Sequence, residues 1–115
     1  SENRKVYRPW GWYDSLEKDS THQVKRIHVY PSHKLSLQRH QHRAERWIII
    51  KGIATVTLDD NDHEFNVGEV VQINIMQVHS LANKTNDDLE IIEVQLGDYL
   101  GEDDIERFED IYGRA

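Results

Sequence analysis

At 115 residues the chain is long enough for one domain with a modest core, and too short for a catalytic domain plus a regulatory one. Lysine and arginine number 14 against 21 acidic residues, so the net charge of −7 would repel nucleic acid and anionic membranes. Cysteine is absent, which excludes disulfides and thiolate ligands and leaves His with Asp, Glu or Gln to hold a metal. No transmembrane stretch or secretory leader is visible, and a cytoplasmic location is expected.

Short apolar runs rich in β-branched and aromatic residues recur at intervals of roughly ten residues along most of the chain. We expect strands over residues 24–30, 34–42, 47–58, 64–73, 78–83 and 89–97. Turn residues separate several of these runs, for example Pro31-Ser32 and the acidic stretch 59–62. This spacing is typical of an all-β sandwich or a closed barrel.

Helical spacing is confined to the C-terminal end. From Gly101 the first turn is acidic, and apolar residues then recur near helical spacing. These residues are Ile105, Phe108, Ile111 and Tyr112. The pattern predicts one short amphipathic helix that closes the domain. Residues 1–5 are expected to be a loose end, and the whole chain, residues 1–115, is expected to be a single domain.

The segment that begins at Gln38 carries half of a candidate metal site. Strand alternation would send Gln38, His40 and His42 to one face, so both imidazoles could converge on one ion. A turn at residues 43–44 and a second strand from Glu45 would bring the carboxylate back towards them.

A third imidazole, His79, comes from a different predicted strand and completes the set. Imidazoles with a carboxylate suit Zn, Mn, Fe, Co or Ni, with Zn or Mn first, in a site that keeps coordination positions open. The sequence therefore predicts four metal ligands and Gln38 as a candidate fifth. The four are His40, His42, Glu45 and His79. The alternative is a polar barrel interior without a metal.

These two segments resemble the two signature motifs of the cupin superfamily. The resemblance includes the histidine pair with Glu45 and Gly52, followed by Gly68, Asn74, Met76, His79 and Asn83. Glu45 follows His42 one residue sooner than in the commonest cupin spacing. Asn74 and Met76 stand where cupins usually have Pro and Gly. The resemblance implies a cupin-type double-stranded β-helix, a jelly-roll barrel, to which the predicted C-terminal helix is added.

Longer phrases resemble the type II mannose-6-phosphate isomerases. They cover residues 8–16, 24–31, 34–47 and 90–114. Proteins of this family form the isomerase domain of bifunctional mannose-1-phosphate guanylyltransferase/mannose-6-phosphate isomerase enzymes, and also occur alone. No Gly-rich nucleotidyltransferase loop is present, so the resemblance is to the isomerase part. Arg46 stands where the family usually has His. Since alternation turns Arg46 away from Glu45, we expect a changed outer surface and an intact metal site.

The resemblance implies metal-dependent interconversion of mannose 6-phosphate and fructose 6-phosphate through an enediol, a step of GDP-mannose biosynthesis. A divalent ion would polarise the sugar oxygens. Glu93 is the candidate acid/base, because it shares a strand face with Gln95, a candidate substrate contact. Phosphate recognition calls for Arg or Lys. Arg8 and Arg43 are the main candidates, Arg43 also for catalysis because it adjoins the metal motif; Arg26 and Lys34 are further candidates.

Two other functions remain open. A cupin oxygenase would use the same ligands to hold Fe(II). A non-catalytic sugar-phosphate-binding module would keep the barrel and the metal without the proton shuttle. A homodimer is also expected, because Leu35 and Leu37 would lie opposite the ligands and need covering, although another sheet of the same chain could cover them. A separate guanylyltransferase is a further candidate partner.

Overall fold

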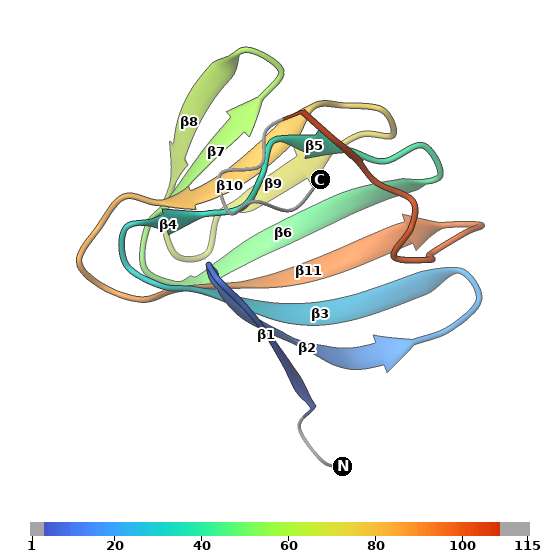
Figure 1. The fold of residues 1–115 in the computed structure, drawn as a ribbon, viewed down its shortest axis with the longest axis horizontal. Coiled ribbons are helices and arrows are strands. Elements are labelled where there is room, and N and C mark those ends of the chain that lie inside the picture. The colour runs from blue at the N-terminus through green and yellow to red at the C-terminus, as the bar shows by residue number, and fades with distance from the viewer. Residues whose placement is uncertain (1–3, 109–115) are drawn as a thin grey trace.

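The computed structural model describes residues 4–108, which form an all-β fold of two antiparallel sheets (Figure 1). The first sheet has the order β1 (Lys5–Arg8), β2 (Gly11–Lys18), β3 (His22–Val29), β11 (Leu89–Gly97), β6 (Arg43–Lys51) and β9 (Val70–Ile73). The second has the order β12 (Glu106–Arg107), β5 (Gln38–Arg39), β10 (His79–Asn83), β7 (Ala54–Leu58) and β8 (Asn61–Phe65), with β4 (His33–Lys34) also paired to β10.

The two sheets face each other and enclose the core. In Figure 1 the long strands β3, β11 and β6 lie side by side, with β7 and β10 across from them. The buried apolar cluster draws on both sheets and includes Trp47, Ile49, Val56, Leu81 and Ile91. The predicted all-β class and the double-stranded β-helix are therefore confirmed. Nothing in residues 4–108 forms a helix of the length and apolar character that crossing a membrane requires.

Alternation on β3, β11 and β6 sorts the inward side chains into rows across the first sheet. One row is apolar and the next two are largely polar. The apolar row is Ile27, Ile91 and Ile49; the polar rows are Lys25, Glu93 and Trp47, and Gln23, Gln95 and Glu45. The core thus fills one end of the barrel, while polar groups line the interior at the other end.

The predicted C-terminal helix is wrong for the described residues. Residues 102–103 form a turn, and Glu106–Arg107 form β12, which pairs with β5. The Phe108 amide also donates to the Leu37 carbonyl at 2.8 Å. These long-range backbone hydrogen bonds override the local amphipathic pattern. Ile111 and Tyr112 lie outside the described residues, as do residues 1–3 of the predicted loose end, whereas Lys5 already begins β1.

The two strand segments next to the metal motif are shorter than predicted. Residues 34–42 contain only the last residue of β4 and the two residues of β5, and residues 47–58 are divided between β6 and β7. Gly52 makes the second break, because its φ of +82° favours glycine and an added Cβ would lie 2.5 Å from the Asp88 carbonyl oxygen. Leu35 was predicted to lie opposite the ligands, but it packs against the core and lines the same cavity as His40.

The turn that departs from the cupin motif is also formed. Met76 has a φ of +68°, a left-handed conformation that favours glycine. Its amide donates to the His40 carbonyl at 2.8 Å, which ties this turn to the metal motif. Methionine therefore adopts the left-handed conformation at the place of the usual glycine.

Candidate active site

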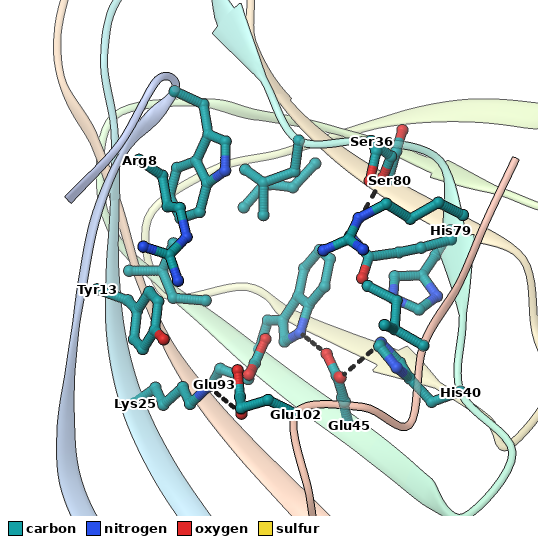
Figure 2. A pocket seen from close by; sticks show the side chains of 18 of the residues that line it. Arg8, Tyr13, Lys25, Ser36, His40, Glu45, His79, Ser80, Glu93 and Glu102 are labelled. Atoms are coloured by element: carbon teal, nitrogen blue, oxygen red, sulfur yellow. Dashed lines mark hydrogen bonds and ion pairs between the residues drawn. The ribbon is translucent and has the colours of Figure 1, made fainter. Parts of the chain in front are cut away.

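A cavity of about 200 Å³ lies between the two sheets (Figure 2). Strands β3, β6 and β11 supply one wall, and β5, β10 and β12 supply the other. Its polar lining includes Arg8, Lys25, Gln38, His40, Arg43, Glu45, His79, Glu93, Glu102 and Arg107. Most of the residues that the sequence singled out therefore meet in one place.

Three of the predicted metal ligands meet in this cavity. His40, Glu45 and His79 each offer a ligand atom, and these atoms lie within 4.8 Å of one another. The His40 Nε2 atom is 3.2 Å from Glu45 Oε2, and the two imidazole centroids are 5.1 Å apart. The three residues are only 1–3% exposed. They are close enough to be the protein ligands of one ion.

Both imidazoles are held in the tautomer that a metal ligand needs. His40 Nδ1 lies 2.6 Å from the Asp104 carbonyl oxygen, and His79 Nδ1 lies 2.8 Å from the Gln77 carbonyl oxygen. A carbonyl only accepts hydrogen bonds, so each Nδ1 carries a proton, and Nε2 of the neutral imidazole is the atom left to bind a metal. Burial also lowers the pKa of His40, which favours the neutral form that binds metals.

Glu45 supplies the negative charge of the group. Burial alone would raise its pKa, but the charge of the neighbouring Arg43 outweighs burial and is the main cause that lowers the pKa to about 2. Arg43 Nε and Trp47 Nε1 each donate to the carboxylate at 2.8 Å. Two imidazole nitrogens and one ionised carboxylate are a ligand set that fits a divalent metal such as Zn or Mn.

The predicted convergence of His42 on the same ion is not what the structure shows. β5 ends at Arg39, and residues 41–42 form a bend, so strand alternation stops at His40. The Asp104 carboxylate holds this bend, because it accepts from the His42 amide at 2.9 Å. The His42 side chain is exposed, and its ring lies 5.7 Å from the Tyr99 ring.

Gln38 lines the cavity beside His40, Glu45 and His79, the three residues called the metal group below. It is the Cα partner of His79 across β5 and β10, and its side-chain Nε2 donates to the Ser36 carbonyl at 3.2 Å. The amide oxygen is the atom that could bind an ion. Gln38 therefore stays a candidate fifth ligand.

Glu93 points inward, as predicted from strand alternation, and is 5% exposed. Burial and the nearby charge of Glu45 raise its pKa to about 8. Gln95 is fully buried, and its Nε2 donates to Glu93 Oε2 at 2.6 Å. Gln95 is absent from the cavity lining, so it is placed to orient Glu93 rather than to touch a ligand.

The predicted phosphate-binding arginines occupy different parts of the cavity. Arg43 is buried beside the metal group, with Nη2 3.3 Å from His40 Nε2. Arg8 is exposed and lies across the cavity from His40 and His79 (Figure 2). Arg26 and Lys34 do not line the cavity.

The family model for "Mannose-6-phosphate isomerase C-terminal" matches residues 1–110. The chain belongs to this family. The alginate biosynthesis protein AlgA of Pseudomonas syringae pv. tomato is 57% identical over 110 residues, which are 96% of this chain and 23% of AlgA. A mannose-1-phosphate guanylyltransferase of Escherichia coli K12 is 46% identical over 113 residues, 98% of this chain and 24% of the enzyme. The chain thus spans about a quarter of the length of these relatives.

Solved structures confirm the fold. A Klebsiella pneumoniae protein with a double-stranded β-helix domain gives a TM-score of 0.79 at 16% identity, covering 91% of this chain and 90% of that one. A cupin-2 domain from Rhodospirillum rubrum gives 0.73 at 17% identity, covering 90% of this chain and 77% of that one. At these identities the likeness concerns the fold alone.

Arg46 marks where this member of the mannose-6-phosphate isomerase C-terminal family departs from the pattern quoted above. Its Nη1 donates to the Glu45 backbone carbonyl at 3.0 Å, and Arg46 does not line the cavity. The residue therefore faces away from the metal group, as strand alternation predicted.

Sequence reasoning missed four residues that shape the site. They are Lys25, Glu102, Asp104 and Arg107. Lys25 could have been found, because it alternates with the buried Ile27 and Val29 on β3. The other three lie in the stretch that was predicted to be helical, where strand pairing with β5 gave no local signal.

Asp104 holds the loop that carries His40. Besides the His40 contact to its carbonyl, its buried carboxylate accepts from the amides of Gln41 and His42, both at 2.9 Å. We expect Asp104→Ala to weaken Zn²⁺ binding by about 10–100-fold, because the loop that orients His40 loses both hydrogen bonds to the carboxylate. Competition of the protein with a chromogenic chelator would measure this change. Asp103→Ala, at the exposed neighbouring position, is the control, and an equal loss in both variants would refute this role for Asp104.

Proposed function

We propose that the cavity catalyses the metal-dependent interconversion of mannose 6-phosphate and fructose 6-phosphate through an enediol. The observation that supports this function most strongly is the buried group of His40, Glu45 and His79, with Glu93 in the same cavity. Family membership supports the same activity, and the relatives named for mannose-1-phosphate guanylyltransferase and for alginate biosynthesis suggest a place in GDP-mannose biosynthesis.

His40, Glu45 and His79 would hold the ion, with Gln38 as a candidate fifth ligand and His42 as a prediction that requires its loop to move. When bound, a divalent ion supplies a positive charge that stabilises negative charge developing on the sugar oxygens. Two imidazoles and one carboxylate leave coordination positions open for a ligand.

The reaction moves one proton between C2 and C1 of the sugar and a second proton between the C2 and C1 oxygens. Glu93 would accept the proton from one carbon and return it to the other, since a carboxyl whose pKa lies near neutrality can do both. Gln95 keeps the Glu93 carboxyl in place. Arg43, next to the metal group, would donate to a sugar oxygen at the reacting end, and Arg8 would contact the phosphate.

Isomerase turnover of the metal-stripped protein, re-supplied with one divalent ion at a time, tests this function. We expect Zn²⁺ or Mn²⁺ to restore formation of fructose 6-phosphate in the parent protein and not in His79→Ala, with solvent deuterium entering at C2 of mannose 6-phosphate. Turnover without dioxygen would argue against an oxygenase. Sugar-phosphate binding without exchange under any ion would favour a non-catalytic module.

Three statements on assembly and location stay predictions. They are a homodimer, a separate guanylyltransferase as partner, and a cytoplasmic location. Sedimentation velocity of the purified chain would decide the first, and co-purification with a guanylyltransferase from its own cell extract would test the second.

A further inference from the structure

The cavity gathers positive charge although the protein is acidic overall. Four cationic side chains line it, in a chain with a net charge of −7. They are Arg8, Lys25, Arg43 and Arg107. An acidic protein that concentrates cations in one cavity offers an electrostatic site for an anionic ligand.

Two of these cations are already neutralised. Arg43 Nε lies 2.8 Å from Glu45 Oε2, and Lys25 Nζ lies 2.8 Å from Glu102 Oε2. An anion could bind either cation strongly only by competing with its carboxylate. These two positions are therefore poor primary phosphate sites.

Arg8 and Arg107 differ, because within residues 4–108 neither makes an ion pair with a carboxylate. Arg8 donates from Nη1 to the Tyr7 carbonyl at 3.0 Å, and its guanidinium lies 5.7 Å from the centre of the Tyr13 ring. Both residues are exposed and line the cavity, so a ligand can reach them from solvent.

The strand register gives the span between Arg107 and the metal group. Arg107 on β12 is the Cα partner of Gln38 on β5, which is the Cα partner of His79 on β10. Two strand spacings separate the Cα atoms of Arg107 and His79 by about 10 Å. Arg8 comes from β1, the edge strand of the other sheet, and Figure 2 shows it across the cavity from His79.

We propose that Arg8 and Arg107, one from an edge strand of each sheet, together bind the phosphate of a monophosphorylated sugar whose other end reaches the metal group. This inference rests on the proposed function and adds Arg107 as a specificity-determining residue. Guanidinium groups bind phosphate through paired, charge-assisted hydrogen bonds. An unphosphorylated sugar would leave both arginines without a counter-charge, so the pair selects for the phosphate ester.

Calorimetric titration with mannitol 6-phosphate and with mannitol tests the proposal, because neither compound has a carbonyl to isomerise. Arg8→Gln and Arg107→Gln should each weaken mannitol 6-phosphate binding by about 10–100-fold and leave mannitol binding unchanged. Arg39→Gln is the matched control, since Arg39 pairs with Glu106 and does not line the cavity. Circular dichroism and thermal melting would confirm that each variant is folded.

The outcomes separate this proposal from the isomerase function. Arginine-dependent binding of mannitol 6-phosphate in a protein that never isomerises mannose 6-phosphate would sustain the phosphate site and refute the enzyme. Turnover with an unchanged KM in both variants would refute the phosphate site and leave the enzyme standing. The proposal is also overturned if the parent binds both polyols equally, or if Arg39→Gln weakens binding as much as the other two variants.

Discussion

Glu93→Gln should lower kcat for mannose 6-phosphate by about 10²–10⁴-fold with little change in KM, because it removes the proton shuttle and keeps the shape of the side chain. The fold should tolerate the change, since Glu93 is largely protonated at pH 7 with a pKa of about 8. Steady-state kinetics would measure both constants. Glu102→Gln is the control, because its carboxylate lines the same cavity but pairs with Lys25. A loss of activity no larger in Glu93→Gln than in Glu102→Gln would remove Glu93 from the chemistry.

The raised pKa of Glu93 also predicts how the stability of the metal-free protein depends on pH. Between the unfolded value of 4.5 and about pH 8, the folded protein binds more protons than the unfolded chain, so stability falls as pH rises. Glu93→Gln should abolish this contribution. Its free energy of unfolding in urea should therefore rise relative to that of the parent as the pH increases from 5 to 8. A gap between the two proteins that stays constant over this range would contradict the assignment.

The second large effect is expected for Glu45→Gln. Glu45 is 1% exposed and accepts from Arg43 and Trp47, so the substitution leaves the buried Arg43 without its counter-charge. Removing one partner of a buried ion pair costs about 3–5 kcal/mol of folding free energy. It also removes the only anionic ligand of the metal group, so Zn²⁺ binding should fall with stability.

Urea unfolding and Zn²⁺ titration of Glu45→Gln would measure these two losses. Glu106→Gln, which breaks the exposed pair with Arg39, should cost less than about 1 kcal/mol and serves as the control. Because the pKa of Glu45 is lowered to about 2, its stabilisation is fully present above pH 4.5 and is lost as pH falls towards 2. The stability difference from the parent should therefore shrink on acidification; a difference that grows would be inconsistent with an ionised Glu45.

The parts of the site that follow strand alternation could be predicted from the sequence. Glu45 and Glu93 lie on long, regular strands, so the period of two placed both carboxyl groups inside the barrel. His40 and His79 were identified by motif spacing, and the structure brings both to Glu45. The all-β class followed from the recurrence of short apolar runs, and the double-stranded β-helix followed from the resemblance to the cupin motifs.

The parts that depend on distant backbone contacts could not be predicted. The bend that turns His42 away is held by Asp104, 62 residues further along the chain. Arg107 reaches the cavity because its segment adds a strand to β5, although its local sequence has helical spacing. The pairing of Gln95 with Glu93 required the side-chain geometry, since alternation shows only that both face inward.

Anomalous diffraction from crystals grown with Mn²⁺ tests the central claim of one metal centre most directly. The predicted result is a single strong peak at about 2.0–2.2 Å from His40 Nε2, His79 Nε2 and a Glu45 oxygen, which also decides whether Gln38 or His42 joins them. An anomalous peak at another position, or no peak among these three side chains at saturating Mn²⁺, would contradict it.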